Sequence, residues 1–273
     1  MLEQIKLSEM LEVAVVAARL AGSVALEQMN YAKARIKSSD QLVTETDVRC
    51  QKIIIDRIKQ TYPDDGFIAE EGQSGELYKQ PPRADSEIWW VIDPIDGTNN
   101  FAHRLPLFAI SIAAMYQGRP VVGAIFDPSV DAMFTAVESG SARLNNRTIS
   151  CNEEVIDYFT GIGVDGHYER GTNAPAWLSG LIPRMKVRNL GATALHLAYV
   201  ANGSFAAAVV NTPKLWDIAA GGLIAEAAGA KLSDWQGNDV FPLDLNEYQG
   251  QSIQTLAANQ RIYNELVEFI NAG

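Results

Sequence analysis

Two aspartates three positions apart, Asp93 and Asp96, stand where an apolar run meets a Gly-Thr pair, in the sequence WWVIDPIDGTNNF. The run over residues 88–92 stops at Asp93 and is bounded by proline and glycine, which predicts a buried strand with the two acids at its end. The two carboxylates offer hard oxygen ligands to a divalent cation. Gly97 and Thr98, at the start of a following helix, would turn backbone N–H groups toward an anion. A metal and a phosphate held side by side are what phosphoester hydrolysis needs.

The same residue types also have ordinary structural uses. Asp-Pro and Asp-Gly are common turn dipeptides, and Asp or Thr before a helix is often only a cap. We favour chemistry over capping because Asp93 and Asp96 both follow one buried strand and further acids, Glu70 and Glu71, lie nearby in the sequence.

The string DPIDGTNNF resembles the signature of the inositol monophosphatase family, the metal-dependent, lithium-sensitive sugar-phosphate phosphatases. Further blocks similar to those of the family occur in the same order between Lys37 and Gly229. The DxDxT nucleophile of another phosphatase class is not matched, because two residues separate Asp93 from Asp96. The resemblance implies a mixed α/β fold, the five-layer αβαβα sandwich of inositol monophosphatase and fructose-1,6-bisphosphatase. We expect one domain in two packed halves, residues 1–150 and 151–273.

Composition is that of an ordinary globular protein, with 273 residues of which 47% are hydrophobic. A net charge of −11 argues against nucleic acid or an anionic membrane as a partner. Cys50 and Cys151 lack metal-ligand spacing and are typical of a reducing compartment. Neither a signal peptide nor a membrane-length apolar run is evident, so we expect a cytoplasmic protein.

Helices and strands at regular intervals are expected to position the site. Apolar residues recur at helical spacing over residues 7–29, and a second helix opens at Asp47 and runs to about residue 61. Segments rich in Ile, Val and Phe predict an antiparallel meander over 107–115, 121–126 and 133–137, with turns at Gln117-Gly118 and Asp127-Pro128. The second half alternates strands (160–164, 187–190, 205–210) with helices (191–201, 215–228).

The segment IKSSDQLVTETD also resembles a family block, and Lys37, Asp40 and Asp47 fit its pattern. From the residues alone, Lys37 is a solvated loop residue and Asp47 an acid at a helix N-terminus. The resemblance implies instead that Lys37 and Asp40 belong to a mobile basic loop over the site. It also implies that Asp47 and Thr98 orient the attacking water.

Two more acids gain a role from the resemblance. Glu70 falls in the block that is usually G-E-E, with Ala69 here in place of the glycine, which costs backbone freedom but no ligand. Otherwise Glu70 is a solvated loop acid. Asp217, in Leu215-Trp216-Asp217, is otherwise a helix N-cap. The resemblance implies that both carboxylates bind metal, Asp217 from the far half of the chain.

The combined hypothesis is a site for two or three Mg²⁺ ions. Glu70, Asp93 and the carbonyl of Ile95 would hold one ion, and Asp93, Asp96 and Asp217 a second. Magnesium is preferred to zinc because every ligand is a hard oxygen. The histidines His103, His167 and His196 are scattered and are interpreted as structural or surface residues. The expected substrate contacts are Gly97, Thr98, Asp96 and Asp217, and the expected catalytic residues are Glu70, Thr98 and Asp47.

The expected substrate is a small phosphate monoester, inositol monophosphate or a related sugar phosphate, cleaved by water without a phosphoenzyme. Inositol-specific relatives carry a Glu shortly before the W-D block, whereas residues 209–213 here contain no acid. Histidinol phosphate, fructose 1,6-bisphosphate and nucleotide-type substrates therefore stay open. An alternative of another class is a non-catalytic scaffold that binds a metal or a partner. Relatives are usually homodimers, so a homodimer is expected.

Overall fold

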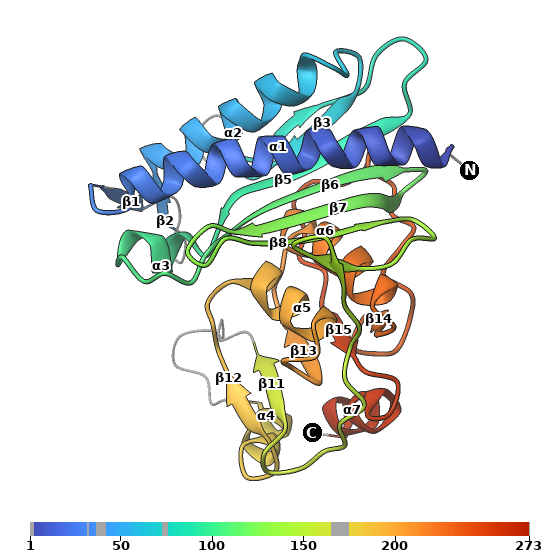
Figure 1. Ribbon diagram of the computed structural model, residues 1–273. Coiled ribbons are helices and arrows are strands. Elements are labelled where there is room, and N and C mark those ends of the chain that lie inside the picture. The colour runs from blue at the N-terminus through green and yellow to red at the C-terminus, as the bar shows by residue number, and fades with distance from the viewer. Residues whose placement is uncertain (1–2, 32, 37–41, 73–75, 165–174, 273) are drawn as a thin grey trace.

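A computed structural model of the chain describes residues 3–31, 33–36, 42–72, 76–164 and 175–272. Helices and sheets alternate in five layers, which confirms the αβαβα sandwich expected from the sequence (Figure 1). The helices are α1 (Gln4–Gln28), α2 (Glu45–Lys59), α3 (Thr98–Ala102), α4 (Ala176–Leu181), α5 (Thr193–Ala201), α6 (Leu215–Ala227) and α7 (Tyr263–Asn271). Helices α1 and α2 cover the outer face of a large sheet, α5 and α6 separate it from a smaller sheet, and α4 and α7 close the far side (Figure 1).

The large sheet has eight strands and is antiparallel except for one parallel pair, β3 with β5. In spatial order its strands are β10 (Arg147–Thr148), β9 (Arg143–Leu144), β8 (Ala132–Val137), β7 (Arg119–Asp127), β6 (Ala109–Tyr116), β5 (Ile88–Asp96), β3 (Gly66–Ala69) and β4 (Tyr78–Gln80). The predicted meander is thus confirmed as β6, β7 and β8. Gln117 and Gly118, both at positive φ, form the tight turn between β6 and β7.

The smaller sheet has five strands, with β11 parallel to both of its neighbours. In spatial order they are β12 (Lys186–Arg188), β11 (Gly161–Val164), β13 (Ala207–Val210), β15 (Thr255–Ala258) and β14 (Lys231–Ser233). A separate hairpin joins β1 (Ala34–Ile36) to β2 (Leu42–Thr44), just before α2.

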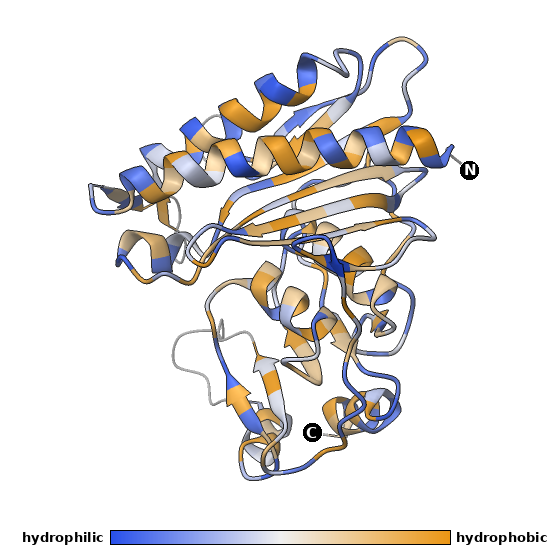
Figure 2. Ribbon diagram, in the orientation of Figure 1, coloured by the Kyte–Doolittle hydropathy of each residue, from blue (hydrophilic) through white to orange (hydrophobic). Residues whose placement is uncertain are grey.

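Three hydrophobic clusters fill the spaces between the layers. Helices α1 and α2 bury one apolar stripe each and keep polar residues outside, whereas the central strands β5 to β7 are largely apolar (Figure 2). Strand β5 is buried along its whole length because helices cover both faces of the sheet. Gly22 allows α1 to approach closely, since a Cβ there would lie 2.7 Å from the Phe126 ring.

Helix α6 is buried on nearly all sides, between the two sheets. It approaches β7 at Gly123, where a Cβ would lie 2.8 Å from the carbonyl oxygen of Ala220. This packing fixes the first turn of α6, which carries Asp217, beside the large sheet. Within the described ranges, no helix has both the length and the apolar character that a bilayer crossing demands.

Candidate metal and phosphate site

A β-bulge brings Asp93 and Asp96 to the same face of the large sheet. Strand β5 extends past the apolar run and ends at Asp96, so both acids lie in its last four residues. Asp93 lies opposite Ser111 and Asp96 opposite Ala109, so two residues of β5 face one residue of β6. Residues three apart on a regular strand point to opposite faces, and the extra residue of a bulge cancels that alternation. Pro94 lies within the bulge, where a missing backbone donor is tolerated.

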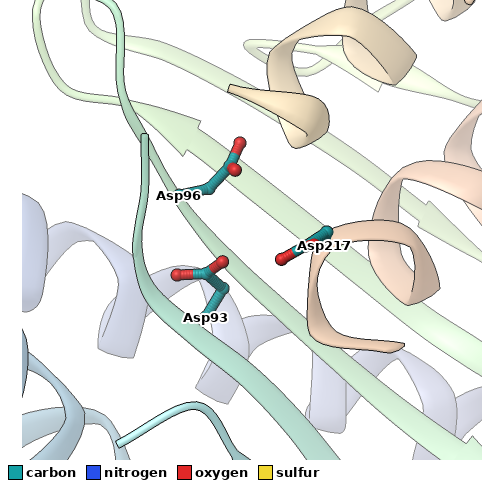
Figure 3. Close-up of side chains that lie close together, drawn as sticks. All are labelled: Asp93, Asp96 and Asp217. Atoms are coloured by element: carbon teal, nitrogen blue, oxygen red, sulfur yellow. The ribbon is translucent and has the colours of Figure 1, made fainter. Parts of the chain in front are cut away.

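Asp217 reaches the same place from the second half of the chain. The carboxylate oxygens of Asp93, Asp96 and Asp217 lie within 4.8 Å of one another. Figure 3 shows the two acids of β5 and the acid of α6 turned toward a common point. The hydroxyl of Ser111, the residue opposite Asp93, donates to the carbonyl of Trp216 at 3.1 Å. This bond ties the start of α6 to the strand beside the bulge.

The cluster holds more negative charge than a buried site accommodates alone. Burial raises the pKa of the Asp93 carboxyl well above its ordinary value, and the charges of Glu70, Asp96 and Asp217 raise it further. A divalent cation would reverse this effect, because it attracts every one of these carboxylates. The donors are hard oxygens at close range, so the residues fit Mg²⁺.

Asp96 is held by the second half of the chain as well. Its Oδ1 accepts a hydrogen bond from the backbone N–H of Thr193 at 3.1 Å, and its Oδ2 accepts one from that of Ala194 at 2.7 Å. The segment before α5 is clamped by Asn100, whose Nδ2 donates to the carbonyls of Leu107 and Leu190 at 2.7 and 2.6 Å. Asn100 therefore links α3 to the loop that leads into α5.

Asp47 lies at the third position of α2 rather than at its start, which corrects the predicted helix opening; α2 begins at Glu45 and Thr44 is its N-cap. The Asp47 carboxylate accepts hydrogen bonds from the backbone N–H and the hydroxyl of Thr44 at 2.9 and 2.5 Å. The Thr98 hydroxyl lies 3.0 Å from Asp47 Oδ1 and 3.0 Å from the carbonyl of Ile95, and donates its one proton to either. Burial raises the pKa of Asp47 to about 6, although the hydrogen bonds from Thr44 oppose the shift.

Asp217 has the same helical position as Asp47, the third residue, and so is not the N-cap of α6. Its Oδ2 accepts a hydrogen bond from the backbone N–H of Lys214 at 2.7 Å. The next N–H, of Leu215, donates to the hydroxyl of buried Tyr248 at 2.9 Å. The first turn of α6 is thus held from two directions.

Glu70 follows directly after β3, and its backbone N–H donates to the carbonyl of Ile92 at 3.3 Å. It acts on the cluster through its charge, which is the second contribution to the raised pKa of Asp93. Its neighbour Glu71 is fixed by Gln51 of α2 through hydrogen bonds to both backbone polar groups of Glu71.

Gly97 is the N-cap of α3 and has a φ of +91°. A Cβ at this position would lie 2.9 Å from the carbonyl oxygen of Leu107 and 3.2 Å from that of Gly191. Only glycine combines this backbone conformation with so close an approach. Thr98, the residue after it, is the first residue of α3.

The remaining predicted residues divide into two groups. Lys37, Asp40 and His167 lie outside the described residues. His103 is exposed, and His196 is buried in α5, where its Nε2 accepts a hydrogen bond from the backbone N–H of Leu190 at 2.9 Å. His196 therefore has a structural contact, in line with the sequence interpretation.

Several residues that position the acids were given no such role from the sequence: Thr44, which fits the family block of Lys37 and Asp47, and Gln51, Asn100, Ser111 and Tyr248. Thr44 carried a readable signal, because Thr-x-x-Asp before an apolar run is typical of a capping box. The other four act through contacts to distant backbone groups, for which no local pattern exists.

Comparison with known proteins gives concordant matches. The sequence profile of the inositol monophosphatase family matches residues 6–271. A Nus factor SuhB from Pasteurella multocida is 36% identical over 86% of this chain and 88% of its own length. An inositol-1-monophosphatase from Mesorhizobium japonicum is 34% identical over 84% of this chain and 87% of its own. The crystal structure of extragenic suppressor protein suhB from Bartonella henselae has a TM-score of 0.84 at 27% identity, covering 97% of this chain and 99% of that one.

Proposed function

This chain belongs to the inositol monophosphatase family, and on that basis we propose that it is a Mg²⁺-dependent phosphatase that hydrolyses a small phosphate monoester. Inositol monophosphate and related sugar phosphates are the first candidates. The observation that carries the proposal is the meeting of Asp93, Asp96 and Asp217, whose carboxylate oxygens lie within 4.8 Å of one another. The hydrogen bonds that Asp96 and Asp217 accept from backbone N–H groups hold each acid in place, but they do not offset the mutual repulsion of three carboxylates this close together, which a bound cation would relieve.

The proposed ligands are the five predicted ones, namely Glu70, Asp93, the carbonyl of Ile95, Asp96 and Asp217. When bound, Mg²⁺ would polarise the phosphate and lower the pKa of the attacking water. The acids themselves would orient the ions, and the buried setting of Asp93 would strengthen their attraction for a cation.

Asp47 and Thr98 would orient the water. While the Thr98 hydroxyl donates to Asp47, 3.0 Å away, its lone pairs can accept a hydrogen bond from water. Asp47 would keep the hydroxyl in that orientation, and Thr44 would keep Asp47 in place. The backbone N–H groups of Gly97 and Thr98 would contact the phosphate, and no side chain of this set is left to act as a covalent nucleophile.

Substrate selection would involve Asp96 and Asp217 and the segment before α6. Strand β13 ends at Val210, and Asn211 follows it in the segment before α6. Inositol-specific relatives carry a Glu in this segment. The Asn211 side chain accepts a hydrogen bond from Gln254 at 3.1 Å. A site without that acid is expected to discriminate less between polyols, so a panel of monoesters is the appropriate assay.

We further propose a homodimer in the cytoplasm, folded as one domain whose halves close on the site. The two cysteines, Cys50 and Cys151, are free thiols, which supports a reducing compartment. Light scattering on the purified protein measures the oligomeric state directly.

A second candidate is a role in transcription, which the name of the Pasteurella multocida relative favours. Such a role would not require turnover. A variant that lacks phosphatase activity but still supports the transcriptional role in cells would separate the two functions.

The test of the first proposal is phosphate release from inositol monophosphate, sugar phosphates and histidinol phosphate, with Mg²⁺ and with EDTA. Asp93→Asn and Asp217→Asn are expected to lower kcat/KM by at least about 100-fold. Loss of a residue that only supports a metal ligand costs about 10- to 100-fold, and loss of a direct ligand should cost no less. Asp131→Asn, an exposed aspartate paired with Arg19, is the control and is expected to retain full activity. Undiminished turnover in both site variants would refute the metal model.

A further inference from the structure

We propose that Gln51 is a positioning residue for the metal site: its side-chain amide fixes the Glu70–Glu71 turn and so sets the affinity of the site for Mg²⁺. This inference rests on the proposed function, because it takes Glu70 as a metal ligand. Gln51 itself would touch neither the metal nor the substrate.

The amide of Gln51 makes a two-point contact with a single residue. Its Nε2 donates to the carbonyl of Glu71 at 2.5 Å, and its Oε1 accepts from the backbone N–H of Glu71 at 2.9 Å. Gln51 is buried, with 5% of its surface exposed, and Glu71 is buried as well. The side chain thus replaces the neighbouring strand that would otherwise pair with this stretch of backbone.

The contact is needed because regular pairing ends just before it. Strand β3 ends at Ala69, and the bond from the Glu70 N–H to the carbonyl of Ile92 is already long, at 3.3 Å. Beyond this bond, the Glu71 peptide is held from the side of α2 by Gln51. Glu70 is therefore fixed between β5 on one side and α2 on the other.

The orientation of Glu70 matters to the acid cluster. The parallel pairing of Ala69 with Ile92, and the bond from the Glu70 N–H to the Ile92 carbonyl, place Glu70 beside Asp93, and its charge helps to raise the pKa of that acid. In a turn that moved freely, the Glu70 carboxylate would occupy several positions. Metal binding would then have to restrict it to one of them, and this loss of entropy would weaken the affinity for Mg²⁺.

Gln51 also lies one helical turn after Asp47, so the two point to the same side of α2. Helix α2 therefore contacts Thr98 through Asp47 and supports the turn that carries Glu70 through Gln51.

The test replaces Gln51 with methionine, which has a similar length and volume but cannot make either hydrogen bond. Calorimetric titration with Mg²⁺ alone is expected to show an affinity about 10- to 100-fold weaker than wild type, the usual effect of losing an outer-shell partner. The Mg²⁺ concentration for half-maximal phosphate release should rise by the same factor, while kcat at saturating Mg²⁺ stays within about threefold.

A matched control is Asn259→Leu, which removes another buried side-chain amide that binds backbone groups, those of Glu154, Arg261 and Ile262. This variant is expected to lose stability with its Mg²⁺ affinity unchanged. If Gln51→Met does not fold, Gln51→Asn keeps the amide but shortens its reach by one methylene, and should again weaken Mg²⁺ binding.

Wild-type Mg²⁺ affinity in folded Gln51→Met or Gln51→Asn would overturn the positioning role and leave the phosphatase proposal intact. A wild-type protein that binds no Mg²⁺ would instead overturn the proposed function, and this inference with it.

Discussion

The carboxylate of Asp96 accepts a 2.7 Å hydrogen bond from the backbone N–H of Ala194, in the first turn of α5. An acid of the large sheet therefore sits at the N-terminal end of a helix that precedes the central strand of the smaller sheet. Backbone N–H groups at such an end carry partial positive charge and attract a carboxylate. The two halves of the chain are thus joined at the candidate site itself, and changes at this junction should affect stability and activity together.

Asn100→Ala removes the amide that supports this junction. The carbonyls of Leu107 and Leu190 lose their donor, so we expect the free energy of unfolding to fall by about 1–3 kcal/mol. Phosphate release should fall by about 10-fold or more, because the segment that holds Asp96 is released. Urea unfolding and an activity assay below the transition measure the two effects.

The control for that variant is its neighbour. Asn99 is exposed, whereas Asn100 is buried. Asn99→Ala is expected to change the free energy of unfolding by less than about 0.5 kcal/mol. Equal losses in both variants would mean that the helical context of α3, and not the bridge to Leu190, matters.

Gly97→Ala tests how closely the turn after β5 must pack. A Cβ would meet the carbonyl oxygen of Leu107 at 2.9 Å, in a backbone conformation with a φ of +91°. Gly237 offers a matched control, because its φ is +89° and the nearest atoms to a Cβ are 3.7 Å away. We expect Gly237→Ala to cost about 1–2 kcal/mol from the conformation alone. Gly97→Ala should cost about 1–3 kcal/mol more than Gly237→Ala, because its Cβ overpacks the turn. Urea unfolding of both variants measures the difference. Equal losses of stability would show that close packing at Gly97 does not matter.

Asp47 makes a specific contribution to the pH dependence of stability. Burial raises its pKa from 3.8 to about 6, so the native state binds more protons than the unfolded chain between these values. The contribution is fully present below about pH 4 and is lost as the pH rises through about 6, a change of about 3 kcal/mol for about two pKa units. In EDTA, Asp47→Asn should therefore lose less stability than wild type between pH 4.5 and pH 7.

Urea unfolding at several pH values measures this difference. The exposed Asp131→Asn is expected to follow the wild-type curve. A wild-type slope in Asp47→Asn would show that Asp47 titrates near its ordinary value in the folded protein.

The sequence predicted most of the helices and strands because their periodicities are local properties, whereas the five-layer arrangement followed from the family resemblance. The apolar run before Asp93 and the turn at Gln117-Gly118 each specify their element without help from distant residues. Helix ends are harder to predict: the apolar spacing places the opening of α2 at Asp47, whereas the Thr44-x-x-Asp47 capping box marks the true start at Glu45.

The bulge in β5 could not be predicted in the same way. Whether Asp93 and Asp96 share a face depends on how β5 pairs with β6, where Ile110 alone lies opposite Pro94 and Ile95. The family resemblance predicted that Asp93 and Asp96 act together, but it did not predict the β-bulge that brings them to one face of the sheet. Likewise, Gln51 and Asn100 act on backbone groups at Glu71 and Leu190, and a contact of this kind leaves no periodic trace in the sequence.

Asp93→Asn should have opposite effects on the metal-free and the metal-bound protein. Without a cation, burial and the charges of Glu70, Asp96 and Asp217 all disfavour the ionised form of Asp93. An amide at this position removes that repulsion and keeps the acceptor for the backbone N–H of Ile95, now 3.0 Å away. In EDTA at pH 7.5 the variant is therefore expected to melt at a temperature equal to or above that of wild type. Mg²⁺ at 100 times its Kd should stabilise the wild-type protein by about 2.7 kcal/mol and so raise its melting temperature. The melting temperature of the variant should not change. A variant that is destabilised in EDTA and still stabilised by Mg²⁺ would mean that Asp93 is a structural acid and that the cation binds elsewhere.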